Sequence, residues 1–160
     1  MRGGSLPPAL LCLALGLLLA YVPRKWILPS IATLAFVSAF VVLVGFPAEL
    51  EELVFAVCWA SVVGTALLLH WPSPIPMPVV LGLSANAGLW SGAVIALSGT
   101  PLDLAVALPV VLVCIPAGLL LKTPLRLGIK IIGSWLVAVA LLMAAVPLIE
   151  TPGYAPDHYE

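Results

Sequence analysis

The sequence predicts an all-α membrane protein, a bundle of six transmembrane helices joined by short loops. Three observations lead to this fold class. Hydrophobic residues make up 63% of the 160 residues and charged residues 8%, whereas a soluble domain carries about 25% charged residues. The apolar residues form runs of about 17 to 22, the length of a helix that crosses a ~30 Å hydrocarbon core. The 6 basic and 7 acidic residues fall mostly in the gaps between these runs, sorted by sign.

Helices are favoured over a β-barrel by the character of these runs. A backbone in hydrocarbon has to satisfy its own hydrogen bonds, which helices and closed barrels achieve. Barrel strands alternate apolar and polar residues, whereas these runs are apolar on every face. We therefore expect one transmembrane domain over residues 1–149 and a flexible acidic tail over residues 150–160, where prolines and acids are concentrated.

Prolines, glycines and charged residues mark the ends of the apolar runs. A proline lacks the amide hydrogen that a helix interior needs, and a charge is costly in lipid, so both belong near helix ends. On these signals the six expected spans are residues 6–22, 26–46, 49–70, 79–98, 102–121 and 125–149.

The first span is stopped by the sequence Pro23-Arg24-Lys25. It could instead be a signal peptide, because Arg2 precedes its apolar core. An uncleaved membrane anchor is favoured, because no small-x-small cleavage site follows and a proline with two basic residues is an unusual cleavage flank.

The second and third spans begin with residues that suit a first helical turn. Pro29 lies in the first turn of the second span, where a missing amide hydrogen is tolerated. Glu49, Glu51 and Glu52 open the third span, where acids interact favourably with the helix dipole. Residues 71–78 follow with proline at every second position, and we expect extended backbone there.

Two prolines, Pro109 and Pro116, lie inside the fifth span. Pro116 removes a backbone hydrogen bond and is expected to kink the helix. A carbonyl freed by this kink could coordinate a solute, so Pro116 is a candidate pathway residue; the alternative is a kink that only fits the bundle. In the sixth span, Lys130 lies about one turn from the end and can extend its amine to the interface.

The basic residues predict the orientation in the membrane. With six spans, the first, third and fifth gaps lie on one side and both termini on the other. The other side holds Arg2 and every acid in the sequence. Because basic loops stay in the cytoplasm, we expect a multi-pass protein of the bacterial inner membrane with both termini outside the cytoplasm. The basic residues on the cytoplasmic side are Arg24, Lys25, Lys122, Arg126 and Lys130.

Small residues spaced four apart mark the expected helix contacts, since helices in lipid associate through close backbone packing. The third span carries Ala56, Ala60 and Gly64, and the fourth carries Gly88 and Gly92 in a Gly-x-x-x-Gly motif. We interpret both stripes as helix-packing surfaces. The alternative is that a glycine-rich helix also lines a narrow path.

Polar side chains within the spans are the candidates for such a pathway. Asn86 is the one side-chain amide in the transmembrane part, and Ser84 and Ser91 lie on the same span. Asn86 either hydrogen-bonds to a neighbouring helix or contacts a transported solute.

No other chemistry is indicated. The sequence shows no nucleophile–base pair, phosphate-binding loop, carboxylate pair or basic stripe, so we expect no enzyme activity, no cofactor and no nucleic-acid partner. His70 beside Trp71 is interpreted as an interfacial anchor; a metal site at His70 would need a second histidine or a carboxylate nearby. Cys12, Cys58 and Cys114 lack metal or redox spacing and are expected to be buried as small apolar residues.

The sixth span has a distinctive order of residues, Arg126-Leu-Gly-Ile-Lys-Ile-Ile-Gly-Ser-Trp-Leu-Val-Ala-Val-Ala-Leu-Leu-Met. Together with the acidic start of the third span and the glycine-rich fourth span, it resembles HupE/UreJ-like membrane proteins. The resemblance implies the six-span fold and a role in nickel or cobalt uptake, or an accessory role for hydrogenase or urease. Members carry a histidine and aspartate motif in the first span and histidines in the fourth, where this chain has Trp90 and Ser91. First-row metals favour imidazole or carboxylate ligands, so the resemblance supports the fold more than metal transport.

Two functions follow as expectations. A permease for a small solute or metal ion should have a polar cavity that reaches the bilayer midplane near Asn86. A non-catalytic accessory subunit of a larger membrane complex should instead be a solid bundle with one small-residue face left bare. The expected partners are the lipid bilayer and other membrane subunits or a second copy of the chain.

Overall fold

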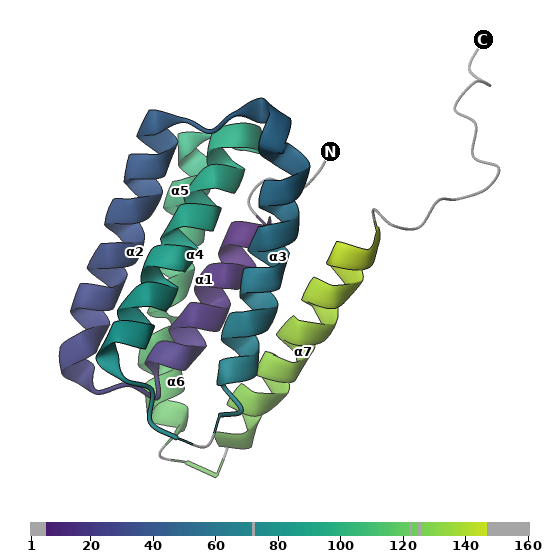
Figure 1. The fold of residues 1–160 in the computed structure, drawn as a ribbon. Helices are drawn as coiled ribbons and strands as arrows, with labels where there is room; N and C mark the ends of the chain where they lie inside the picture. Colours follow the sequence, from purple (N-terminus) through teal and green to yellow (C-terminus); the bar gives the residue numbers. More distant parts are fainter. Residues whose placement is uncertain (1–5, 72, 122, 125, 147–160) are drawn as a thin grey trace.

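The computed structural model describes residues 6–71, 73–121, 123–124 and 126–146, and this part of the chain is helical with no strand (Figure 1). It confirms the all-α fold class. The expected acidic tail lies outside the described residues. The helical segments are α1 (Leu6–Leu19), α2 (Arg24–Val44), η1 (Ala48–Leu50), α3 (Glu51–Leu68), α4 (Met77–Ser98), α5 (Pro101–Ala107), η2 (Leu108–Val113), α6 (Cys114–Leu120) and α7 (Arg126–Ala145).

Within the described residues, five helical stretches are long and apolar enough to cross a membrane, and one shorter apolar helix, α1, accompanies them. The protein is therefore a multi-pass membrane protein by the length and composition of its helices. The five long stretches are residues Arg24–Val44, Ala48–Leu68, Met77–Ser98, Pro101–Leu120 and Arg126–Ala145.

Helix α1 differs from the full span expected over residues 6–22. It has 14 residues, which at ~1.5 Å per residue reach about 21 Å. After Leu19 the chain continues in tight turns, with the Tyr21 amide donating to the Leu18 carbonyl and the Val22 amide to the Leu19 carbonyl. Because α1 is apolar on all faces, it is buried on nearly all of them. It lies inside the bundle against α3, α4 and η2 (Figure 1).

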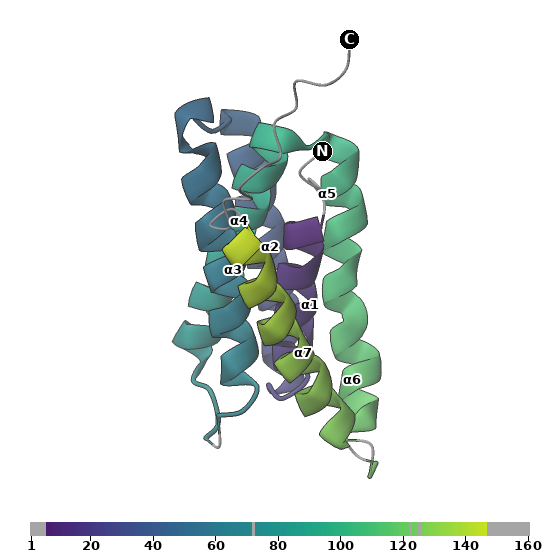
Figure 2. The ribbon, with the colours of Figure 1, turned by 90° about the vertical axis from the view of Figure 1, so that its right-hand side faces the viewer.

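The other helices pack around α1. Helix α4 packs along α2 on one side and against α1 and α3 on the other, and α7 packs on α3. Figure 2 shows α6 and α7 on one side of the bundle, diverging from the turn that joins them. Leu11, Leu15, Leu34, Val62 and Val80 are fully buried in the core that these helices share.

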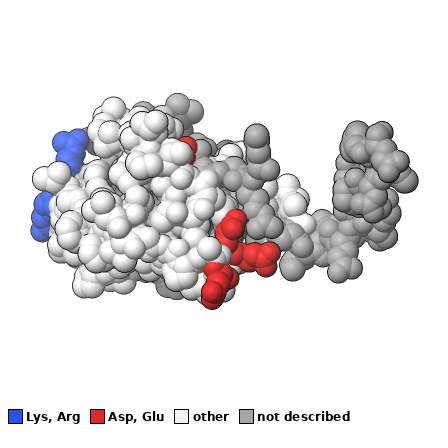
Figure 3. Space-filling view, turned by 90° about the horizontal axis from the view of Figure 1, so that it is seen from above, with Lys and Arg blue, Asp and Glu red and all other residues white. Residues whose placement is uncertain are grey.

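The charged side chains separate to the two ends of the bundle. The described acids, Glu49, Glu51, Glu52 and Asp103, lie on the α2–α3 connection or at the first turns of α3 and α5, at the upper end of Figure 1. Figure 3, seen from this end, shows these acids on the end face and basic side chains at the rim. Arg24, Lys25 and Arg126 belong to the first turns of α2 and α7, and Lys130 lies about one turn into α7, all toward the opposite end.

Asp103 also has a local role that the sequence analysis did not assign. Its carboxylate accepts hydrogen bonds from the Thr100 amide at 2.6 Å and the Thr100 hydroxyl at 3.0 Å, which forms a capping box at the start of α5. Such a cap satisfies amide groups that a helix end leaves without partners.

Two proline expectations need correction. Helix α2 begins at Arg24, so Pro29 lies inside the helix and not in its first turn; the Thr33 hydroxyl donates to the Pro29 carbonyl at 2.8 Å. The fifth span is interrupted over residues 108–113 by the 3-10 segment η2, with Pro109 near its start. Pro109 cannot donate an α-helical hydrogen bond, which favours the tighter segment. The distortion therefore begins well before the expected kink at Pro116.

Candidate functional site

The candidate pathway residues line neither of the two cavities described below. Asn86 is half-buried on α4, and its side-chain oxygen accepts a hydrogen bond of 2.9 Å from the Trp90 indole one turn later on the same helix. The Asn86 oxygen is therefore bonded within its own helix. The sequence analysis had considered a bond to a neighbouring helix instead. Pro116 lies on the exposed surface of α6.

The two serines of α4 are buried but differ in their bonding. The Ser84 hydroxyl donates to the Val80 carbonyl at 2.9 Å, a bond to the preceding turn that leaves no donor for a solute. The Ser91 hydroxyl has no hydrogen-bond partner in the described structure and lies beside the Cys12 thiol of α1. Cys12, Cys58 and Cys114 are all buried and free, as expected.

The two small-residue stripes have different surroundings. At Gly88 an added Cβ would lie 2.7 Å from the Leu34 carbonyl oxygen, and at Gly92 it would lie 2.8 Å from the Ser38 carbonyl oxygen. Both glycines therefore lie at a close contact between α4 and α2. This contact has no room for a side chain or a path.

The stripe on α3 is bare. Ala56, Ala60 and Gly64 are all exposed, and an added Cβ at Gly64 would meet nothing within 4 Å. Among the described residues, no neighbouring helix covers this stripe as we expected. We call this surface the α3 stripe.

His70 joins α3 to α7. Its Nε2 lies 3.2 Å from the Ser134 hydroxyl, which also donates to the Lys130 carbonyl at 3.1 Å. Among the described residues no three His, Cys, Asp or Glu side chains come together in a way that could hold a metal ion. His70 therefore has a structural partner in Ser134.

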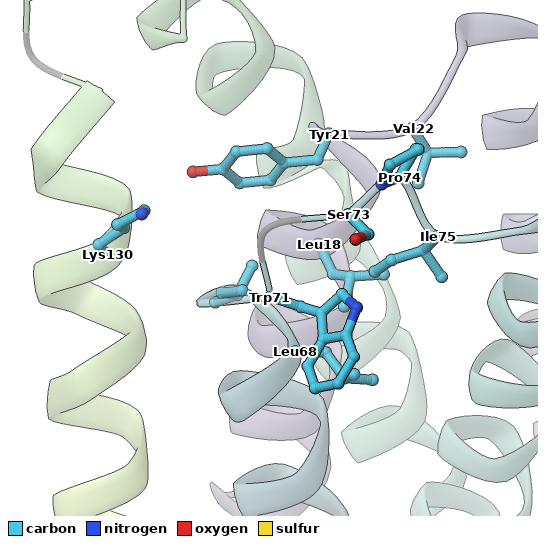
Figure 4. Close-up of a pocket in the computed structure, with 10 residues that line it drawn as sticks. Leu18, Tyr21, Val22, Leu68, Trp71, Ser73, Pro74, Ile75 and Lys130 are labelled. Carbon is cyan, nitrogen blue, oxygen red and sulfur yellow. The ribbon is translucent and has the colours of Figure 1, made fainter.

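Two adjoining cavities, which the sequence analysis did not predict, open at the basic end of the bundle. The first, of about 290 Å³, lies between the end of α1, the α3–α4 loop and α7 (Figure 4). The second, of about 480 Å³, lies between the end of α6 and the start of α7. Both are lined by Tyr21 and Lys130, and neither is lined by Asn86. The two basic residues Arg126 and Lys130, four apart near the start of the sixth span, were the sequence signal that could have indicated this site.

No protein-family model, no curated protein and no solved structure matches the chain. The resemblance to HupE/UreJ-like proteins therefore stays a prediction. The arrangement of the described residues is the basis for the function proposed below.

Proposed function

We propose that this protein is a non-catalytic membrane subunit that packs within the bilayer, through the α3 stripe, against another membrane protein or a second copy of itself. The observation that carries the proposal is the bare α3 stripe on an otherwise closely packed bundle. Small residues spaced four apart let two helix backbones approach closely, which is the main source of helix association in lipid. The chain uses the same spacing at Gly88 and Gly92, where α4 meets α2.

The interior supports this proposal over transport. Two of the side chains that could line a path are engaged within their own helix, Asn86 with Trp90 and Ser84 with Val80, while Ser91 is buried without a partner among the described residues. The centre of the bundle is filled by α1, whose Leu11 and Leu15 are fully buried. A subunit that works through contacts needs a packed scaffold and an exposed small-residue face, and the buried core and the exposed α3 stripe support the proposal on these two points.

Enlarging the α3 stripe is expected to abolish association without unfolding the protein. Because an added Cβ at Gly64 would meet nothing within 4 Å and Ala60 is exposed, leucines at Ala60 and Gly64 should fit the free chain but prevent close approach of a partner helix. We expect A60L/G64L to lower the cross-linked or co-purified fraction at least tenfold, measured in native membranes. The matched control is Ala39→Leu, at another exposed alanine, on α2. Equal association of A60L/G64L and the wild type would contradict the proposal.

A second candidate function is transport of a small solute or metal ion, as the resemblance to HupE/UreJ implies. The interrupted fifth span favours it, since broken helices form the solute sites of many transporters. Here η2 packs directly against α1.

Transport makes a separate prediction for cells that express the protein. If Asn86 and His70 belong to a pathway, Asn86→Leu and His70→Ala should each lower nickel or cobalt accumulation severalfold, while Ala39→Leu leaves it unchanged. Accumulation that is the same with the variants, the wild type and an empty vector would contradict transport.

We also propose that the protein resides in the bacterial inner membrane, with its basic end in the cytoplasm and both termini outside. The support is the separation of basic and acidic side chains to opposite ends, since basic loops are retained in the cytoplasm.

Cysteine labelling tests this orientation cleanly, because Cys12, Cys58 and Cys114 are all buried. A cysteine at exposed Ala48, beside the acids, should react with an impermeant maleimide in intact spheroplasts. A cysteine at exposed Pro23, beside Arg24, should react only after lysis. Labelling of both positions from the same side would contradict the six-span topology.

A further inference from the structure

The two cavities at the basic end share two polar side chains and have apolar walls. Tyr21 and Lys130 line both, and we call the pair of cavities the interfacial cavity. Figure 4 shows the Tyr21 hydroxyl extending toward α7, where Lys130 lies, with the Ser73 hydroxyl on the loop behind it. Leu18 and Leu68 line the first cavity, and Leu121 and Leu127 line the second.

The cations of the interfacial cavity, Lys130 and Arg126, lie far from the acids of the described residues. Those acids, Glu49, Glu51, Glu52 and Asp103, lie at the other end of the bundle. Two positive charges beside a cavity without a counter-charge form an attractive site for an anion.

The neutral polar groups around the cations are hydrogen-bond donors. Partial burial raises the pKa of the Tyr21 hydroxyl above its ordinary value, although nearby Arg126 acts in the opposite direction. Tyr21 therefore keeps its proton and can donate it to an anionic oxygen. The Ser73 hydroxyl and the Trp71 indole line the same cavity and can also donate. Several donors and two cations match the oxygen-rich surface of a phosphate group.

The surroundings of the cavity are those of a lipid and not of an aqueous ion. The site lies at the end of an apolar bundle, where lipid headgroups would be. Leu127 and Ile131, on α7 beside Lys130, are 64% and 67% exposed and offer an apolar surface to an acyl chain. Helices α6 and α7 diverge above the site (Figure 2). The acyl chain of a lipid whose headgroup is bound at this end can therefore extend along α7.

We propose that the interfacial cavity binds the phosphate headgroup of an anionic phospholipid. Lys130 and Arg126 attract the phosphate, Tyr21 and Ser73 donate hydrogen bonds to its oxygens, and the leucines of the walls contact the glycerol and upper acyl region. Basic pockets between transmembrane helices are known to suit such headgroups. This site is distinct from the α3 stripe, because neither cavity is lined by Ala56, Ala60 or Gly64.

The test measures binding of phosphatidylglycerol to the purified full-length protein in detergent, from the rise of the melting temperature as lipid is added. Phosphatidylcholine and inorganic phosphate are titrated in parallel. We expect stabilisation by phosphatidylglycerol only. Each of Lys130→Gln and Arg126→Gln should weaken the apparent affinity for phosphatidylglycerol about fivefold, since one basic residue near a lipid surface contributes about 1 kcal/mol. The double variant should weaken this affinity about thirtyfold. Tyr21→Phe should weaken it severalfold without changing net charge.

The matched control is the double variant R24Q/K25Q, which removes two exposed cations from the same end of the bundle but outside the cavity. It should bind phosphatidylglycerol within twofold of the wild type. Equal weakening in R24Q/K25Q and K130Q/R126Q would overturn the proposal, because the attraction would then come from the basic end as a whole. Stabilisation by inorganic phosphate of the same size would also overturn it, because the ligand would then be a free anion. Circular dichroism confirms that each variant keeps its helical content.

Discussion

Replacing Gly88 or Gly92 with alanine is expected to destabilise the bundle strongly, and replacing either with leucine is expected to prevent folding. An added Cβ at Gly88 would lie 2.7 Å from the Leu34 carbonyl oxygen and 2.9 Å from the Val37 Cβ. At Gly92 the corresponding distances are 2.8 Å to the Ser38 carbonyl oxygen and 2.9 Å to the Val41 Cβ. The obstructing atoms belong to the backbone or are fixed close to it, so α2 itself would have to move.

The size of this effect follows from the cost of overpacking. Inserting a methyl group into a well-packed contact costs about 1–3 kcal/mol, and a helix shift loses further contacts along the α2–α4 packing surface. We expect each alanine variant to lower the free energy of unfolding by at least about 2 kcal/mol, measured by titration with sodium dodecyl sulfate in mixed micelles. The leucine variants should be degraded in cells.

Gly82 provides the matched control on the same helix. An added Cβ at Gly82 meets nothing within 4 Å, and alanine is favoured over glycine in a helix by up to ~1 kcal/mol. Gly82→Ala should therefore leave the stability unchanged or raise it. If Gly88→Ala is as stable as Gly82→Ala, the close contact between α4 and α2 is not formed as described.

Gly16→Leu is expected to have the second largest effect, because Gly16 lies where α1 meets the interrupted fifth span. An added Cβ at Gly16 would lie 2.6 Å from the Val111 carbonyl oxygen and 2.8 Å from the Val113 Cγ1. A leucine would push α1 away from η2 and disturb the contacts of the most buried helix. The loss should exceed the roughly 1–3 kcal/mol typical of overpacked cores.

The measurement compares Gly16→Leu with Gly118→Leu, which lies on α6, just beyond η2. An added Cβ at Gly118 meets nothing within 4 Å, so its leucine variant should unfold at nearly the same detergent composition as the wild type. Gly16→Leu should be expressed poorly and should expose Cys12 to maleimide without denaturant. Protection of Cys12 in folded Gly16→Leu would contradict the placement of α1 against η2.

The positions of the helices could be predicted from the sequence, because each boundary depends on a local signal. Helix α3 begins at Glu51, and α4 begins at Met77 and ends at Ser98. Each of these boundaries lies within two residues of the expected one. Polar and proline-rich gaps interrupt the apolar runs at these points, so no tertiary contact is needed to place them. The separation of charges to opposite ends follows directly from the same boundaries.

The partners of the helices could not be predicted, because packing depends on which faces meet. The stripes at Gly88 and at Ala60 have the same spacing of small residues, yet only the first is filled by a neighbouring helix of the chain. An apolar run also looks the same whether it faces lipid or protein, so nothing distinguished α1 as the central helix. The hydrogen bond that the Asn86 oxygen accepts from Trp90, one turn away on the same helix, was likewise not predicted.

The interfacial cavity was missed for a related reason. Its lining comes from Tyr21, Trp71, Leu121 and Lys130, which are far apart in sequence and meet only when three loops gather at one end of the bundle. A single basic residue such as Lys130 suggests only that its amine reaches the interface.

The central place of α1 has a consequence for biosynthesis. This helix leaves the ribosome before α3, α4 and η2, which enclose it in the folded protein. A nascent chain that stops after α2 would hold α1 in the translocon or in lipid without its final neighbours. The bundle can therefore close only once the fifth span has been inserted, and shortened chains should be recognised by membrane proteases.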